Sequence, residues 1–121
     1  MGGVVLVDDD SAITMMGELL LARAGIAPVH VFNDGASALG HMQAALPDLL
    51  ITDLNMPGMS GADLLAAVRG HAKLSQIPVV VLTADGRADH HDQLLRAGAT
   101  QVWLKPFSPN TFGMQVRDLI S

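Results

Sequence analysis

The sequence predicts an α/β fold, a (βα)5 doubly wound parallel sheet with helices on both faces. Five short apolar runs alternate along the chain with five segments whose apolar residues recur at helical spacing. The first run, residues 4–7, is continuously apolar, which is typical of a strand buried on both faces. We find no internal repeat, low-complexity segment or linker, so we expect one domain over residues 1–121.

The first predicted strand is residues 4–7, and Asp10 or Ser11 is placed to cap the helix that follows. Helical spacing on that segment predicts a core face formed by Ile13, Met16, Leu20 and Ala24. Gly25 ends this helix. Several methionines are interpreted as packing and loop-anchoring residues: Met15, Met16, Met42, Met56 and Met59.

The rest of the chain repeats the same alternation. The remaining strands are predicted at residues 28–32, from residue 49 to Asp53, at 78–82 and at 101–104. The helices between them are predicted from the turn at 33–35 to Pro47, from Ala62 to about Gly70, and from Arg87 to a stop at Gly98. A last helix carries Phe112, Val116 and Leu119.

Composition excludes several classes of function. The formal net charge is −5, the seven Lys and Arg residues are scattered, and aromatic residues are few, so the basic stripe and stacking platforms of a nucleic-acid binder are missing. The lack of cysteine excludes disulfides and thiolate zinc sites. No apolar run approaches the roughly 18 residues of a membrane helix, and no basic segment precedes the first run. We expect a cytoplasmic protein with no direct contact with nucleic acid or membrane.

Polar side chains follow four of the five predicted strands. Asp8 and Asp9 come after the first strand, Asp53 after the third, Thr83 after the fourth and Lys105 after the fifth. Because parallel strands present their carboxyl ends on one edge of the sheet, we expect these side chains to converge on a single cleft.

The chemistry of this set favours a bound cation. Carboxylates held close together repel one another, and the usual outcomes are a raised pKa on one of them or a bound cation. Asp8, Asp9 and Asp53 offer hard oxygen ligands with no His or Cys nearby, which favours Mg²⁺ or Ca²⁺ over zinc. A site with few protein ligands suits Mg²⁺, and the backbone carbonyl of Asn55 is placed to add another ligand.

Two further side chains extend the prediction to phosphoryl transfer. Lys105 and Thr83 add hydrogen-bond donors for an anion beside the metal. A carboxylate, a divalent metal, an ammonium group and a hydroxyl are together what phosphoryl transfer to an aspartate requires. We expect Asp53 to be the acceptor because it is central.

Four blocks resemble the receiver domain of two-component response regulators, including chemotaxis regulators, in order and spacing. They are Asp8-Asp9, residues 53–61, Thr83-Ala84 and Lys105-Pro106-Phe107, and the resemblance covers essentially the whole chain. It implies a flavodoxin-like fold with strand order 2-1-3-4-5. It also implies an aspartyl phosphate at Asp53, with phosphate delivered by a sensor histidine kinase or a histidine phosphotransfer protein. The resemblance therefore implies that the chain acts as a phosphoacceptor signalling domain and not as a turnover enzyme.

The resemblance also assigns roles residue by residue. Asp9 and Asp53 are expected to bind Mg²⁺ directly, Asp8 through water, and Asn55 through its backbone carbonyl. Thr83 is similar to the family's switch hydroxyl. Lys105 is similar to its phosphate-binding lysine, and the bond from this lysine to the following proline is expected to be cis.

One position departs from the family pattern. Many receivers carry Tyr or Phe three residues before the lysine, where this chain has Val102. Trp103 is expected in the core on the opposite face of the strand, with a partner for its indole N–H, so it cannot replace that ring. We still expect a downstream target to bind the face formed by residues 84–104. His90 and His91 are expected on its solvated or partner-facing surface.

Two other functions remain open from the sequence. A haloacid-dehalogenase-type phosphatase also uses a strand-end aspartate, Mg²⁺, Thr and Lys, but it usually has a second Asp two residues after the nucleophile, where this chain has Asn55. A flavin-binding module would place a phosphate loop after the first strand, where the acidic residues 8–10 repel phosphate. The chain works either as a stand-alone regulator or as part of a longer protein, such as a hybrid kinase or a transcription factor.

Overall fold

The computed structural model describes residues 2–121 and contains all ten predicted elements. In chain order they are β1 (Val4–Val7), α1 (Ser11–Arg23), β2 (Val29–Phe32), α2 (Gly35–Ala44), β3 (Leu49–Asp53), α3 (Gly61–Gly70), β4 (Val79–Thr83), α4 (Ala88–Arg96), β5 (Gln101–Leu104) and α5 (Phe112–Ile120). Among residues 2–121, no helix has the length and apolar character needed to cross a membrane.

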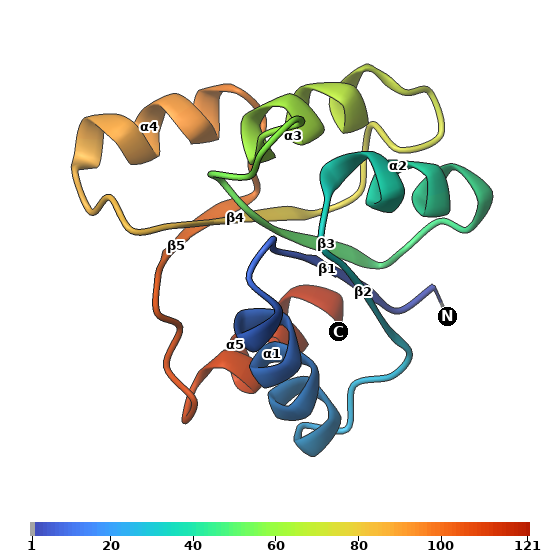
Figure 1. Cartoon of the computed structure of the whole chain (residues 1–121), viewed down its shortest axis with the longest axis vertical. Coiled ribbons are helices and arrows are strands. Elements are labelled where there is room, and N and C mark those ends of the chain that lie inside the picture. Colours follow the sequence, from blue (N-terminus) through green and yellow to red (C-terminus); the bar gives the residue numbers. More distant parts are fainter. Residues whose placement is uncertain (1) are drawn as a thin grey trace.

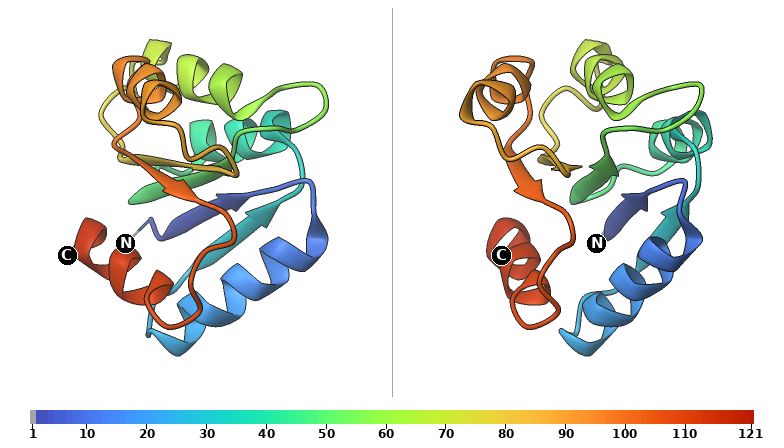
Figure 2. Two further views of the ribbon diagram at one scale, coloured as in Figure 1. Left: turned by 90° about the vertical axis from the view of Figure 1, so that its left-hand side faces the viewer. Right: turned by 60° about the vertical axis from the view of Figure 1, so that its left-hand side comes forward.

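The five strands form one parallel sheet in the order β2-β1-β3-β4-β5, which confirms the predicted topology. Helices α1 and α5 cover one face of the sheet, and α2, α3 and α4 cover the other (Figures 1 and 2). The chain runs from β1 outward to β2 and then returns to β3 on the other side of β1. At such a reversal the connections diverge to opposite faces and leave a crevice at the carboxyl ends of the strands.

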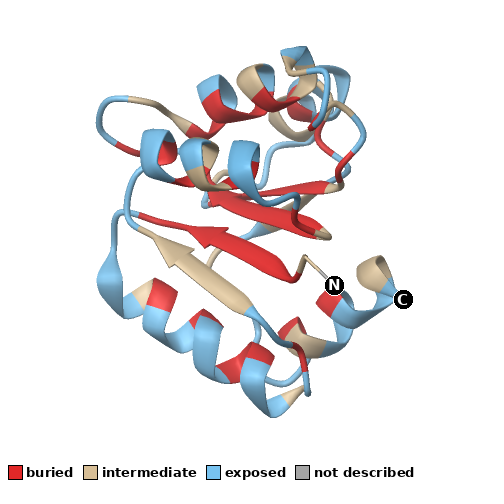
Figure 3. Cartoon of the chain, turned by 90° about the vertical axis from the view of Figure 1, so that its right-hand side faces the viewer, coloured by how far each residue is buried: buried red, intermediate tan, exposed pale blue. Residues whose placement is uncertain are grey.

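Burial explains why the central strands are mostly apolar. Every residue of β1, β3 and β4 is buried, while β2 at the edge is half-buried (Figure 3). Val5 and Val7 face the core under α2, α3 and α4, whereas Val4 and Leu6 face the core under α1 and α5. Both faces of a central strand are therefore covered, as the apolar runs predict.

The predicted core face of α1 is confirmed in part, because Leu20 is buried and Ile13 and Ala24 pack against the same core cluster. The buried residues of the helix are Thr14, Gly17, Leu20 and Leu21. Met15 and Met16 are 70% and 46% exposed, so their predicted packing role is wrong. The close approach of the helix to β1 explains the difference, because a Cβ at Gly17 would lie 2.6 Å from Cδ2 of Leu6. The smallest residue, and not a large apolar one, occupies the point of closest contact.

The start of α3 folds back onto the end of β3. The Gly61 N–H donates to the Leu54 carbonyl oxygen at 2.8 Å. A Cβ at Gly61 would collide with the Asp53 carbonyl oxygen and would lie 2.8 Å from the Leu54 Cα. Ser60 closes the turn as the N-cap, since its side chain accepts from the Asp63 N–H and its own N–H donates to the Asp63 carboxylate. Gly61 therefore sets the path of the loop that leaves Asp53.

We expect Gly61→Ala to destabilise the protein by ~1–3 kcal/mol, the usual cost of forcing an extra carbon into a packed site. Gly70→Ala is the matched control in the same helix, because nothing lies within 4 Å of a Cβ at Gly70. This control should be neutral or stabilising by ~0.4–1 kcal/mol. Urea denaturation of both variants measures the difference, and equal free energies of unfolding would contradict the role given to Gly61.

Candidate functional site

Three carboxylates meet at the carboxyl edge of the sheet. One carboxylate oxygen from each of Asp8, Asp9 and Asp53 can be chosen so that all three lie within 4.8 Å of one another. Asp8 and Asp9 follow β1, and Asp53 ends β3, its neighbour in the sheet, with Val7 paired to Thr52. The parallel register therefore brings together residues that are 45 positions apart in the chain, from Asp8 to Asp53. This is the convergence that the strand ends predict.

The environments of the three carboxylates differ. Asp8 is fully buried, Asp53 is 6% exposed and Asp9 is exposed. The Oδ1 atom of Asp8 accepts from the Asp10 N–H at 3.0 Å, and the Asn33 amide donates to the Asp8 backbone carbonyl at 2.8 Å. Asp10 itself turns away to cap α1, because its Oδ1 accepts from the N–H of the second helical residue at 2.9 Å. The acidic run thus splits into site residues and a helix cap.

Lys105 joins the cluster from the other side. Its Nζ lies 3.1 Å from Asp8 Oδ2 and 3.1 Å from Asp53 Oδ1. The Lys105 N–H donates to the Thr83 carbonyl oxygen at 2.8 Å, which anchors the residue beside β4. The Lys105–Pro106 bond is cis, as expected, and the Ala27–Pro28 bond is also cis, which was not predicted. The side chain therefore reaches across β4 to touch the residues at the ends of β1 and β3.

The electrostatics of the cluster are unbalanced. Burial raises the pKa of Asp8, and the hydrogen bonds from the Asp10 N–H and Lys105 offset this only in part. For Lys105, burial lowers the pKa, but hydrogen bonds to Asp8 and Asp53 outweigh burial and leave the pKa raised. Three carboxylates and one ammonium leave a formal charge of −3 + 1 = −2. An all-oxygen set with excess negative charge fits a hard divalent cation.

Thr83 ends β4 and is 2% exposed. Its hydroxyl accepts from the Asp85 N–H at 3.1 Å and lies 3.2 Å from His90 Nε2. His91 Nε2 lies 2.8 Å from the Asp85 carbonyl oxygen. His90 and His91 are predicted on a solvated or partner-facing surface, and the His90 side chain is only 19% exposed and is turned toward the strand end. Sequence spacing carried no signal for this contact, because it depends on the path of residues 84–87.

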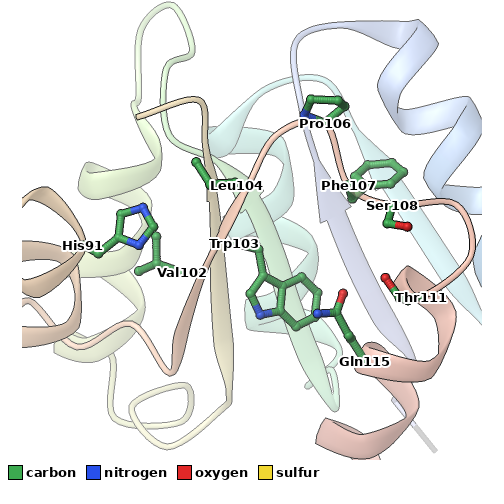
Figure 4. Close-up of a pocket in the computed structure, with 9 residues that line it drawn as sticks. All are labelled: His91, Val102, Trp103, Leu104, Pro106, Phe107, Ser108, Thr111 and Gln115. Atoms are coloured by element: carbon green, nitrogen blue, oxygen red, sulfur yellow. The ribbon is translucent and has the colours of Figure 1, made fainter. Parts of the chain in front are cut away.

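The remaining predicted residues lie around the cluster. Asn55 is exposed in the loop after β3, two residues beyond Asp53. Val102 and Trp103 lie on opposite sides of β5, as predicted, with Val102 beside His91 and Trp103 toward α5 (Figure 4). Trp103 is half-buried and not fully in the core, because β5 is an edge strand. Its indole N–H donates to the side chain of the residue two positions before it, Gln101, at 2.7 Å.

Known proteins share this sequence and fold. The chain is 36% identical over 105 residues to the chemotaxis protein CheY of Pseudomonas aeruginosa, covering 87% of this chain and 85% of that protein. It is 32% identical over 108 residues to the chemotaxis protein CheY-3 of Vibrio cholerae, covering 89% and 83%. The solved structure of the chemotaxis response regulator CheY4 of Vibrio cholerae matches with a TM-score of 0.89 and 33% identity, over 96% of each chain.

The family assignment follows from the whole length of the fold. The model of the response regulator receiver domain family matches residues 4–117, a span that begins with β1, ends within α5 and contains every residue of the acidic cluster. The sheet order of this chain is that of a flavodoxin-like receiver. The chain therefore belongs to the response regulator receiver domain family of two-component signalling proteins.

Proposed function

We propose that residues 1–121 act as one receiver domain in which Asp53 accepts a phosphoryl group. The observation that carries this proposal is the position of the Lys105 ammonium, 3.1 Å from both Asp8 and Asp53 beside a three-carboxylate cluster. An ammonium fixed against the acceptor carboxylate is placed to neutralise charge that develops on phosphoryl oxygens. Thr83 supplies a hydroxyl at the end of the adjacent strand.

The acidic cluster is the proposed site of Mg²⁺. Asp8, Asp9, Asp53 and the backbone carbonyl of Asn55 would hold the ion, with Asp8 acting through water. Their fit to the ion rests on the all-oxygen donor set and its excess negative charge. When bound, Mg²⁺ supplies charge neutralisation for the incoming phosphoryl oxygens.

The proposed transfer of a phosphoryl group to Asp53 uses the side chains around this carboxylate. Asp53 Oδ1 is engaged by the Leu54 N–H at 3.0 Å and by Lys105 at 3.1 Å, while Oδ2 has no hydrogen bond within residues 2–121. A carboxylate oxygen of Asp53 forms the new O–P bond as the P–N bond of a phosphohistidine breaks. The electron pair of the P–N bond leaves with the imidazole of the donor. Lys105 and the Thr83 hydroxyl then donate to the phosphoryl oxygens.

The proposed partners are a phosphohistidine donor and a downstream target. The donor is a sensor histidine kinase or a histidine phosphotransfer protein. The target is proposed to bind residues 84–104, where Leu95 and Leu104 are 45% and 49% exposed. This face is indented by a surface pocket of about 380 Å³, lined in part by His91, Val102 and Leu104 (Figure 4).

Two alternatives are less well supported. A phosphatase of the haloacid dehalogenase type needs a general acid, and the residue two positions after Asp53 is Asn55. A flavin-binding module would place its phosphate against Asp8 and Asp9, where negative charge is already in excess. The receiver proposal uses every charged group that the structure brings together at this edge.

Incubation with Mg²⁺ and acetyl phosphate is expected to add one acid-stable, base-labile phosphoryl group per chain. Asp53→Asn should abolish this labelling, because the amide cannot act as the nucleophile. Asp48→Asn is the control, since Asp48 lies at the other end of β3. Intact-mass spectrometry measures the added mass. Stoichiometric labelling of Asp53→Asn would overturn the assignment, and steady hydrolysis of phosphate esters would favour the phosphatase.

Stability should depend on pH and Mg²⁺ through Asp8. Its folded-state pKa is raised by burial, so the stabilisation it gives is complete below the ordinary aspartate pKa and is lost as pH rises through the folded value. In Mg²⁺-free buffer, Asp8→Asn should therefore raise the free energy of unfolding at pH 7 and flatten this pH dependence.

Adding Mg²⁺ at 100 times its dissociation constant should stabilise the wild-type chain by ~2.7 kcal/mol. Asp8→Asn should lose most of this gain, because the negative charge proposed to hold the ion through water is gone. Asp118→Asn, on the exposed surface of α5, should retain it. Urea denaturation with and without Mg²⁺ gives all these values. Equal Mg²⁺ stabilisation of the Asp8 and Asp118 variants would contradict the proposed metal site.

Activation with Mg²⁺ and beryllofluoride should change the amide chemical shifts of residues 84–104. The reason is that Thr83, at the end of β4, connects the proposed phosphoryl site to the segment that precedes α4. Two-dimensional NMR of labelled protein measures these shifts, with Asp53→Asn as the control that should not respond. Changes that bypass residues 84–104 would remove the support for this face as the target surface.

A further inference from the structure

The Thr83 hydroxyl is already engaged in this structure. Its oxygen accepts from the Asp85 N–H at 3.1 Å and lies 3.2 Å from Nε2 of His90, in the first turn of α4. Thr83 is 2% exposed and the His90 side chain is 19% exposed, so solvent competes only weakly for this contact. The group proposed to bind a phosphoryl oxygen is therefore held by a residue of another element.

The surroundings of His90 favour one direction for the hydrogen bond between Thr83 and His90. A neutral imidazole carries its proton on one nitrogen, and the other nitrogen is an acceptor. Nδ1 of His90 lies 3.9 Å from the Asp85 carboxylate, which favours the proton on Nδ1. Nε2 is then the acceptor, and Thr83 donates its hydroxyl proton to it.

Asp85 stays ionised in this arrangement because of Arg87. The guanidinium lies 2.7 Å from Oδ2 of Asp85 through Nη2 and 3.0 Å from Oδ1 through Nε. These hydrogen bonds from Arg87 lower the pKa of Asp85 far below its ordinary value. The Asp85 carboxylate therefore remains available to orient the His90 ring.

A hydroxyl has one proton and cannot donate it to two acceptors. We propose that His90 is a positioning residue that holds the Thr83 hydroxyl in the unphosphorylated chain and releases it when the hydroxyl turns to a phosphoryl group on Asp53. This inference rests on the proposed function of Asp53. The phosphoryl group and His90 compete for the same proton, so loading of Asp53 breaks a contact that holds α4.

Helix α4 has few buried residues, so its contact with Thr83 through His90 contributes much of its attachment near the proposed phosphoryl site. Over Ala88–Arg96 only Leu94 is buried, and within residues 2–121 the N-cap Arg87 has no side-chain capping bond. Val102 presents no aromatic ring on the α4 side of β5 (Figure 4). The hydrogen bond from Thr83 to His90 is therefore the direct link between the proposed phosphoryl site and α4.

The first test is the tautomer of His90 in the unphosphorylated protein, measured by long-range ¹H–¹⁵N NMR of the imidazole at mildly alkaline pH. We expect the Nδ1–H tautomer, with an Nε2 signal that shifts in Thr83→Ala. Adding Mg²⁺ and beryllofluoride should shift the same signal in the wild-type chain but not in Thr83→Ala. A His90 ring protonated only on Nε2 would overturn the proposal.

The second test is the affinity for beryllofluoride at a fixed Mg²⁺ concentration. His90→Ala should bind about two- to tenfold more tightly, because one neutral hydrogen bond no longer competes for the Thr83 proton. His90→Gln should return toward the wild-type affinity, since its amide oxygen can accept at a similar reach. His91→Ala is the matched control, because His91 contacts the Asp85 backbone and not Thr83.

The outcomes separate this inference from the proposed function. Acetyl phosphate labelling of Asp53 in His90→Ala, together with wild-type beryllofluoride affinity, would overturn the role of His90 while leaving the receiver function intact. Failure of the wild-type chain to be labelled at Asp53 would overturn the proposed function instead. Tighter binding in His90→Ala with rescue by His90→Gln supports the positioning role.

Discussion

The Lys105 ammonium is the group on which the arrangement of this site depends. It is shared between Asp8 and Asp53 at 3.1 Å from each, at the point where the strand order reverses. Without it, the charges at the ends of β1 and β3 would face one another with no counter-charge from the chain. Burial still raises the pKa of Asp8, so this single cation offsets the repulsion only in part. The ionised cluster therefore lowers the stability of the fold, as expected if these residues serve the proposed phosphoacceptor function.

This site could be predicted from the sequence because the carboxyl ends of parallel strands all lie at the same edge of the sheet. Each polar residue at a strand end could be assigned to the same edge once the strands were identified, and this brought Asp8, Asp53 and Lys105 together. On α1, helical spacing correctly predicted Leu20 in the core, but it could not predict that Gly17 is buried while Met16 is exposed. This difference depends on how closely Gly17 approaches Leu6, a property of the packed pair and not of helical spacing.

His90 was missed for a related reason. Adjacent histidines on a polar helix predict a solvated or partner-facing surface, and this pattern does not distinguish His90 from His91. The path of residues 84–87 instead directs the first turn of α4 over the end of β4, where His90 meets Thr83. Local pattern identifies which residues are on a helix, but the connection before the helix decides which of them face a site.

The helices differ in how many of their residues are buried against the rest of the molecule. Helix α3 buries four residues, Gly61, Leu64, Leu65 and Val68, whereas α4 buries only Leu94 within Ala88–Arg96. The contacts of α4 with the loop before it are hydrogen bonds. Such hydrogen bonds can be exchanged for other hydrogen bonds of similar free energy. A buried apolar contact has no such substitute. The element placed to respond to a change at Thr83 is therefore α4, whose first turn meets the Thr83 hydroxyl through His90.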